Sequence, residues 1–169
     1  YQLKTTAFDE SQEEMLKKLE MSTESYREIM DCCEDHDVLF LSTPYNIEDV
    51  EFLEELSVSA YKLASIHAAE PWFARYVAKT GKSIILSTGM ATLAELDETV
   101  RTIRESGCEQ FVLLQCTSTY PATPENSNLM TIPHMKKLFD CEVGLSDHTM
   151  GIGVALSGIA KGATVIEKH

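Results

Sequence analysis

Short apolar runs alternate with amphipathic helical segments along most of the chain, and this alternation limits the possible folds more than any other feature. The runs begin about every 22 to 30 residues, and all but the last are followed by a helical pattern. Such alternation predicts a parallel sheet whose strands are joined by right-handed crossovers. The six predicted strands are 38–41, 60–64, 83–86, 111–116, 142–145 and 164–168.

Residues that start helices support this prediction. Ser22 and Asn46 are suited to cap the helices that follow them, and Pro71 suits the first position of a helix. Thr92 and Glu95 have the spacing of a capping box. Helices are therefore expected after each predicted strand except the last, in the positions that crossovers require.

Two parallel architectures fit the alternation, an open doubly wound sheet and a (β/α)8 barrel. Polar residues end every predicted strand, and no glycine-rich dinucleotide fingerprint follows the first one; both observations favour the barrel. A complete barrel needs eight strands and about 250 residues. We therefore expect an α/β fold that is a partial TIM barrel in residues 22–169, preceded by a polar, acidic connecting arm in residues 1–21.

Composition excludes several classes of partner. A net charge of −13 disfavours nucleic acids and anionic membranes, because nothing neutralises phosphates over an extended surface. The sequence has no apolar window long enough to span a membrane and does not begin with a signal pattern. The five cysteines lack paired CxxC spacing, which favours reduced thiols and a cytoplasmic location.

Two histidines follow predicted strands that neighbour each other in the sheet. His148 comes after 142–145, and His169 follows 164–168. The carboxyl ends of adjacent parallel strands lie about 5 Å apart, so the two imidazoles can share a divalent metal ion. Imidazole and oxygen ligands suit Mn, Fe or Zn, and also Mg where substrate oxygens complete the shell. The alternative is a pair of ordinary hydrogen-bonded residues.

Lys62 interrupts an otherwise apolar strand. Lysine is rarely buried without a partner, which favours a functional role over a side chain that reaches to solvent. That role is either binding of a carboxylate or phosphate, or formation of a Schiff base. Hydroxyl groups at the strand ends, with adjacent backbone N–H groups, can bind phosphate as a set. They belong to Ser65, Ser87, Thr88 and Ser146.

Three further residues have plainer interpretations. Tyr120 lies in a long loop, where it either packs or lines a substrate pocket. His67 and Glu70, just past Ser65, are expected to be solvated loop residues when they are considered alone.

Six motifs occur in a defined order: FLSTPYN, AYKLAS, IILSTGMATLAEL, LLQCTSTYP, VGLSDHTMGIG and VIEKH. In this order and spacing they resemble the sialic acid synthase family, the phosphoenolpyruvate-dependent synthases of N-acetylneuraminate, legionaminate and pseudaminate. The segment DESQEEMLKKLEMS is also similar to the family's connecting segment. The resemblance implies a (β/α)8 catalytic barrel, of which this chain would hold strands three to eight.

The resemblance also assigns roles to residues. His148 and His169 match the family's metal ligands, with Mn or Mg as the expected ion, and together with Lys62 they would be the catalytic residues. The positions that match phosphoenolpyruvate-binding residues are Lys62, Ser65, Ser87 and Ser146, with Thr43 nearby. Ser118 and Tyr120 match the segment near the sugar.

The implied reaction condenses phosphoenolpyruvate with the open-chain aldehyde of an N-acylated hexosamine, such as N-acetylmannosamine, and releases phosphate. One substrate-binding position departs from the family. Where members commonly carry a carboxylate at the sugar end, this chain has His67, with Glu70 as a candidate replacement. The family also uses a lysine on strand two and a C-terminal antifreeze-like domain that covers the partner's site in a homodimer; neither lies in this chain.

Two other functions stay open. One is a different phosphoenolpyruvate-dependent 2-keto-3-deoxy sugar acid synthase, whose phosphorylated sugar would need a second basic pocket that the sequence does not show. The other is a non-catalytic, ligand-binding barrel module, which the histidine at position 67 favours.

Overall fold

The computed structural model describes residues 12–169, which belong to two compact units that divide between Phe40 and Leu41. The first unit contains the helices α1 (Gln12–Leu19) and α2 (Thr23–Asp35). Ser22 caps α2 as predicted, because its hydroxyl oxygen accepts a hydrogen bond of 3.2 Å from the backbone N–H of Ser25. The predicted arm, residues 1–21, lies partly outside the described residues, and its limit stays a prediction.

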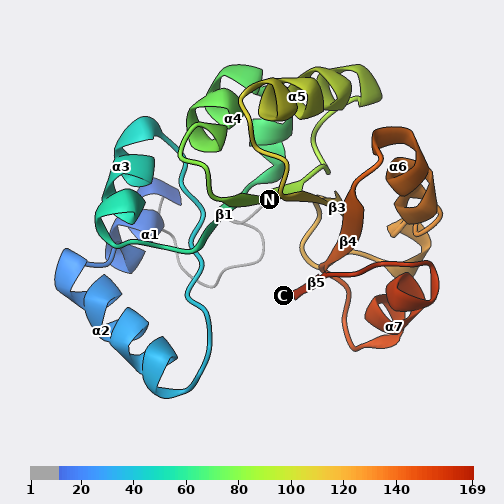
Figure 1. Ribbon diagram of the computed structural model, residues 1–169. Coiled ribbons are helices and arrows are strands. Elements are labelled where there is room, and N and C mark those ends of the chain that lie inside the picture. Colours follow the sequence, from blue (N-terminus) through green and yellow to red (C-terminus); the bar gives the residue numbers. More distant parts are fainter. Residues whose placement is uncertain (1–11) are drawn as a thin grey trace. The chain divides into compact units, whose positions relative to one another are not determined.

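The second unit is built on a parallel sheet in which each strand pairs with the next one along the chain, in the order β1-β2-β3-β4-β5. Figure 1 shows the strands curling in succession, with the helices that connect them on the outer side. The strands of this sheet are β1 (Ala60–Leu63), β2 (Ser83–Ser87), β3 (Phe111–Cys116), β4 (Glu142–Asp147) and β5 (Ile166–Lys168).

Three helices of the second unit, α3 (Ile47–Glu55), α4 (Pro71–Ala78) and α5 (Leu93–Glu105), begin where the sequence predicts. Asn46 caps the first of them by accepting a hydrogen bond of 2.7 Å from Asp49, and Thr92 and Glu95 form the predicted capping box. The other α-helices of this unit are α6 (Thr131–Phe139) and α7 (Gly153–Ala160); its 3₁₀ helices are η2 (Ser65–Ala69) and η3 (Pro124–Asn126).

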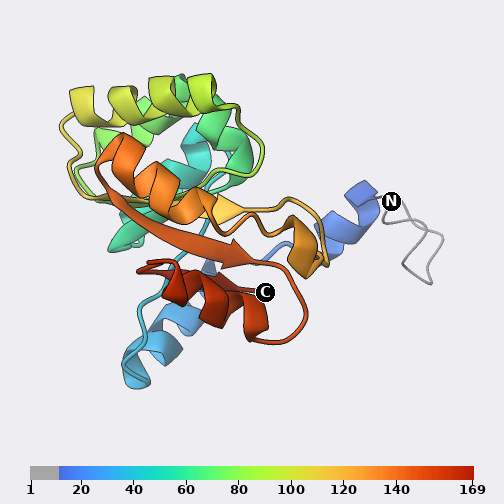
Figure 2. The same ribbon diagram turned by 90° about the vertical axis from the view of Figure 1, so that its right-hand side faces the viewer.

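Alternation along each strand divides the residues between two faces of the sheet. In β1, Tyr61 and Leu63 are fully buried under the helices, and Lys62 between them faces the inner side of the curl. The core lies between the outer face of the sheet and the helices, and both α6 and α7 pack against β4 (Figure 2). Polar residues on the inner face are thereby kept out of this core.

A curled parallel sheet with helices on its outer side confirms the predicted α/β class and is consistent with part of a (β/α)8 barrel. Which strands of a complete barrel these are stays a prediction. Within residues 12–169 no helix is long and apolar enough to cross a membrane.

The predicted strand at 38–41 is wrong. These residues form no strand, and Val38 and Leu39 are 58% and 76% exposed. Next to this segment, one backbone hydrogen bond of 3.4 Å joins the N–H of Lys62 to the carbonyl of Ser42, whereas a strand needs a ladder of such bonds. An apolar run indicates a tendency to be buried, but pairing depends on a neighbouring strand that the run itself cannot specify.

Candidate active site

A cavity of about 360 Å³ lies at the carboxyl ends of the strands, within the size range of small-molecule sites. It contains most of the residues that the sequence singles out. The polar residues that line it are Thr43, Lys62, Ser65, Ser87, Ser118, Tyr120, Ser146, Glu167 and His169.

The register of the sheet brings these residues together. Cys116, Ser146 and Glu167 are direct neighbours across β3, β4 and β5. Because side chains alternate, His148 and His169 continue on the same face as Ser146 and Glu167, two residues further along each strand. Asp147 and Lys168, between them, form an ion pair of 3.3 Å with each other instead of lining the cavity.

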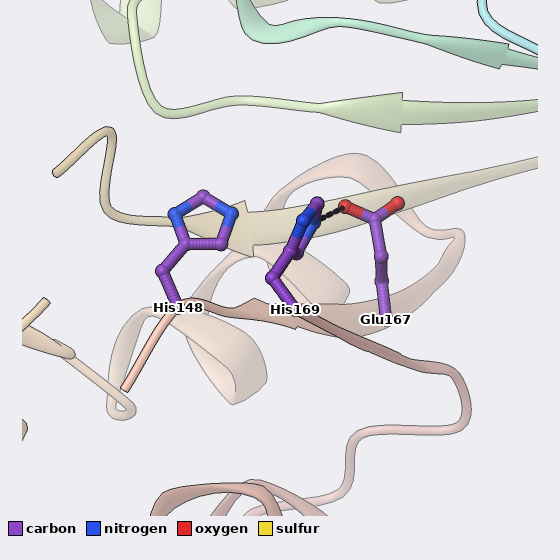
Figure 3. Close-up of side chains that lie close together, drawn as sticks. All are labelled: His148, Glu167 and His169. Atoms are coloured by element: carbon purple, nitrogen blue, oxygen red, sulfur yellow. Dashed lines mark hydrogen bonds and ion pairs between the residues drawn. The ribbon is translucent and has the colours of Figure 1, made fainter. Parts of the chain in front are cut away.

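His148, Glu167 and His169 form a cluster in which one ligand atom from each lies within 4.8 Å of the others (Figure 3). The Nδ1 of His148 lies 2.8 Å from the carbonyl oxygen of Thr117, so it carries the proton and leaves the Nε2 lone pair for another partner. Burial lowers the pKa of His148 below its usual value, although the hydrogen bond to Thr117 acts in the opposite direction. The ring is therefore neutral at pH 7, the form that binds metals.

The proton count in this cluster fits a bound cation. The Ser146 hydroxyl lies 2.6 Å from Glu167 Oε1 and 3.2 Å from His148 Nε2, but it has one proton to donate. Donation to Glu167 leaves the lone pair of His148 without a donor among the described residues. Two imidazoles and a carboxylate suit Mn, Fe or Zn, so the residues present fit the expected divalent ion.

Glu167 also connects this cluster to the rest of the cavity. Its Oε1 lies 2.9 Å from His169 Nε2, and its Oε2 forms an ion pair of 3.3 Å with the Lys62 ammonium. Burial by itself raises the pKa of Glu167, but hydrogen bonds from Ser146 and His169 and the charge of Lys62 outweigh it and lower that pKa. The carboxyl group is therefore ionised at neutral pH.

A second group of polar atoms surrounds the Lys62 ammonium. This ammonium donates to the Ser87 hydroxyl at 2.8 Å and to the Leu63 carbonyl at 3.0 Å, and its side chain is 15% exposed. The Ser65 hydroxyl accepts a hydrogen bond of 3.1 Å from the N–H of Gly89. A cation, several hydroxyls and a backbone N–H on one wall can bind a carboxylate or phosphate.

The loop after β3 covers the imidazoles. The ring of Tyr120 stacks on His148 at 3.9 Å with an angle of 24° between the planes, and it meets His169 edge-on at 5.6 Å. A hydrogen bond of 2.9 Å from the N–H of Ala122 to the carbonyl of His148 holds this loop against the end of β4. Tyr120 thus lies at both the cavity wall and the cluster, and burial raises its pKa.

His67 does not line the cavity. The expectation of a solvated loop residue is wrong for it, because the ring is 1% exposed and packs at 4.4 Å from the ring of Phe73. Its Nδ1 lies 2.7 Å from Glu70 Oε2, and its Nε2 has no hydrogen-bond partner among the described residues. The turn of η2 directs this side chain under α4, a consequence of tertiary packing.

Several residues that the sequence analysis did not assign to the site also line the cavity, among them Glu167 and Cys116. The alternation of side chains signals Glu167, since residues two apart on a strand share a face and His169 is already a candidate. Cys116 ends β3 and accepts a hydrogen bond from the Ser65 hydroxyl at 3.6 Å, a contact between residues far apart in sequence.

The sheet is parallel and curled, has helices on its outer side and has a polar cavity at the carboxyl ends of its strands. This is the arrangement of the active site in enzymes with a (β/α)8 barrel. Comparison with known families narrows this class, because residues 1–169 match the NeuB family. The chain belongs to the NeuB family, which confirms the resemblance that the six motifs indicate.

Curated relatives agree with this assignment. The N,N'-diacetyllegionaminic acid synthase of Campylobacter jejuni is 42% identical over 171 residues, which cover 100% of this chain and 51% of that protein. The human N-acetylneuraminate-9-phosphate synthase is 33% identical over 90% of this chain and 43% of its own length. The chain spans about half the length of the curated relatives it matches.

Solved structures show the same fold. The N-acetylneuraminic acid synthetase of Leptospira borgpetersenii, solved in complex with citrate, superimposes with a TM-score of 0.89 at 30% identity, covering 96% of this chain and 57% of that one. A truncated 3-deoxy-D-arabino-heptulosonate 7-phosphate synthase from Thermotoga maritima reaches a TM-score of 0.76 at 15% identity, covering 88% of this chain and 60% of that one. At that identity the second match shows the fold alone.

Proposed function

We propose that the full-length protein condenses phosphoenolpyruvate with an N-acylated hexosamine to give a nonulosonic acid and phosphate. One observation carries the proposal: a single cavity joins the anion-binding wall around Lys62 to the cluster of His148, Glu167 and His169. Membership of a family whose relatives are named synthases of such acids supports it.

In this proposal Lys62 and the hydroxyls of Ser65, Ser87 and Ser146 bind the carboxylate and phosphate of phosphoenolpyruvate, with Thr43 nearby. A divalent ion held by His148 and His169, Mn or Mg, would supply Lewis acidity toward a carbonyl oxygen. Ser118 and Tyr120 line the cavity where the sugar would lie. Fixed cations and hydroxyl dipoles stabilise charge that develops during the reaction.

C3 of phosphoenolpyruvate attacks the aldehyde carbon of the open-chain sugar and forms the new C–C bond, while the aldehyde oxygen gains a proton. Water adds to C2 of the resulting cation and loses a proton. The tetrahedral intermediate collapses with cleavage of the bond between C2 and the phosphate oxygen, which releases phosphate and leaves a keto acid.

Phosphate release from phosphoenolpyruvate tests the proposal. We expect release by the full-length protein when N-acetylmannosamine or a related N-acyl sugar and Mn²⁺ are both present. His148→Ala should abolish this release and weaken Mn²⁺ binding. Loss of an outer-shell partner costs about 10–100-fold in metal affinity, and loss of a direct ligand should cost at least as much. His134→Ala, on the exposed side of α6, is the matched control. Unchanged Mn²⁺ affinity in His148→Ala would show that the ligand assignment is wrong.

A specific observation favours a second candidate, a non-catalytic module. His67 occupies the position at which the resemblance places a carboxylate, and it is buried outside the cavity. If Mn²⁺ binds but no sugar in a panel of N-acyl hexosamines triggers phosphate release, the binding module replaces the synthase. Release with a phosphorylated sugar alone would instead indicate another phosphoenolpyruvate-dependent 2-keto-3-deoxy sugar acid synthase.

The proposal includes a cytoplasmic homodimer as the working form. The five cysteines are all unpaired, which supports a reducing compartment. Sedimentation of the full-length protein tests the dimer.

A further inference from the structure

A buried ion pair lies behind the candidate metal cluster. Asp147 directly precedes His148 in the sequence, and Lys168 directly precedes His169. Asp147 and Lys168 are the last pair in the register of β4 and β5. Because side chains alternate along a strand, both lie on the face opposite the imidazoles, and neither lines the cavity. The ion pair is thus one peptide unit away from each candidate histidine ligand.

The Asp147 carboxylate is enclosed and depends on Lys168. The residue is 2% exposed, and its Oδ2 has no hydrogen-bond partner among the described residues. The Lys168 ammonium lies 3.3 Å from Oδ2 and supplies the opposite charge. Removal of one partner from a buried pair leaves an uncompensated charge, which is strongly unfavourable. The ends of β4 and β5 are therefore joined by an interaction that neither strand can lose without rearrangement.

The same pair holds the backbone on both sides of His148. Asp147 Oδ1 accepts hydrogen bonds from the N–H of Thr149 at 2.9 Å and from the Thr149 hydroxyl at 2.7 Å. The Lys168 ammonium donates a hydrogen bond to the carbonyl of Thr149. His148 is the residue between Asp147 and Thr149, so rotation of either adjoining peptide unit would break one of these bonds.

The backbone of His169 is tied to the same place. Its N–H donates a hydrogen bond of 3.2 Å to the carbonyl of Asp147, one residue beyond the last pair of the register. The rings of His148 and His169 meet edge-on, with their centroids 4.5 Å apart, and a ligand atom of each lies in the cluster (Figure 3). Metal ligands must be held to within about 0.5 Å of the productive geometry, so the backbone that carries them has to be fixed.

We infer that Asp147 and Lys168 are positioning residues, whose ion pair holds the imidazoles of His148 and His169 at the separation that a shared divalent ion requires. The inference rests on the proposed function and deepens it, because it assigns a role to two residues that touch neither ion nor substrate. Their effect passes through the backbone of the two histidines. Loss of a residue that orients a metal ligand typically costs about 10–100-fold in metal affinity.

Binding of Mn²⁺ to the EDTA-treated full-length protein, measured by isothermal titration calorimetry, tests the inference. We expect Lys168→Met to weaken binding by at least about tenfold. Lys168→Arg should bind within about twofold of the wild type, since the guanidinium keeps the charge and the donors. Asp147→Asn/Lys168→Met removes both charges, leaves no unpaired carboxylate and so keeps the test open if Lys168→Met does not fold. Wild-type affinity in this double variant would overturn the inference.

Lys82→Met is the matched control for a general loss of stability. Lys82 forms an ion pair of 2.6 Å with Glu54, and its side chain is 24% exposed against 33% for Lys168. It directly precedes β2, at the end of the sheet away from the cluster. We expect Lys82→Met to lower the free energy of unfolding in urea while the Kd for Mn²⁺ stays within about twofold. A loss of Mn²⁺ affinity equal to that of Lys168→Met would show that stability, and not positioning, explains the effect.

Amide hydrogen exchange separates this inference from the proposed function. If the wild type binds no Mn²⁺, the metal assignment of the proposed function fails, and exchange in the metal-free protein, followed by NMR, decides the inference. We then expect the amides of Thr149 and His169 to exchange at least about tenfold faster in Lys168→Met than in Lys82→Met. Equal exchange in the two variants at both amides would refute the positioning role.

Discussion

At the scale of single residues, Glu167 shows how one side chain can couple two binding regions. It accepts hydrogen bonds from Ser146 and His169 and forms an ion pair with Lys62. Its charge balances the ammonium on one side and can complete a metal ligand set on the other. In the proposed function, the same carboxylate would therefore influence both anion binding at Lys62 and cation binding at the imidazoles.

A conservative change at this residue should affect the cation most. We expect Glu167→Gln to weaken Mn²⁺ binding by about 10–100-fold, because it removes a negative charge and an acceptor beside His169. Isothermal titration calorimetry measures the change, with Glu125→Gln on exposed η3 as the control. Equal Mn²⁺ affinity in the wild type and Glu167→Gln would exclude Glu167 from the cluster's function.

Tyr61 provides a pH-dependent contribution at the same scale. Burial, followed by the hydrogen bond from its hydroxyl to Glu54, raises the pKa of Tyr61 above its usual value. Since the unfolded residue titrates near pH ~10, the folded state holds its proton longer, and stability falls as pH rises above that value. We expect the free energy of unfolding, measured in urea between pH 8 and about 11, to fall less steeply in Tyr61→Phe. An identical slope in both proteins would contradict this.

At the scale of elements, helix starts are encoded locally. In α5 the Thr92 hydroxyl accepts a hydrogen bond from the N–H of Glu95 at 3.3 Å, and the Glu95 carboxylate accepts one from the N–H of Thr92 at 2.7 Å. The partners are three residues apart, so the sequence reveals the box without knowledge of the fold. The predicted caps at Ser22 and Asn46 are confirmed for the same reason.

Removal of this cap should destabilise the second unit. We expect Thr92→Ala to lower the free energy of unfolding by about 0.5–2 kcal/mol, because two backbone N–H groups lose their partners or their geometry. Urea denaturation followed by circular dichroism measures the change. Thr23→Ala, at an exposed position in the first turn of α2, should change stability much less. Equal losses in the two variants would argue against the capping box.

Whether a predicted strand forms depends on whether it has a neighbouring strand to pair with. The apolar runs that became β1 to β5 find neighbours in consecutive order along the chain. The run at 38–41 has the same local character but forms no strand. Local sequence specifies which residues tolerate burial, whereas pairing requires another strand at the right distance.

At the scale of the whole molecule, the candidate metal cluster joins β4 to β5. His148 follows β4, and Glu167 and His169 come from β5 and its end, so an ion bound there crosslinks the sheet. Anything that binds the folded state alone stabilises it by mass action. Mn²⁺ should therefore act on the stability of the fold as well as on any reaction.

This effect is measurable without a substrate. We expect Mn²⁺ at 100 times its Kd to stabilise the EDTA-treated full-length protein by about 2.7 kcal/mol, seen as a higher Tm in differential scanning calorimetry. His169→Ala should lose the shift, and His134→Ala should keep it. A shift of equal size in His169→Ala would place the bound ion elsewhere.

The sequence by itself determined the features that depend on near neighbours along the chain. They are the alternation of strands and helices, the helix caps, the placing of Lys62 within a strand, and the motifs that mark the family. Each of these features is defined by residues close together in the sequence or by a pattern of fixed period. The sequence alone is therefore sufficient to recognise them.

Only the tertiary structure decided the features that depend on curvature and register. The curl of the sheet brings Glu167 against Lys62, and packing under α4 withdraws His67 from the cavity. The tertiary structure also leaves residues 38–41 without a pairing strand and builds the cavity from segments that lie far apart in the sequence. These contacts join residues far apart in the chain, and their geometry arises when the helices bury the outer face of the sheet, a process that no local pattern describes.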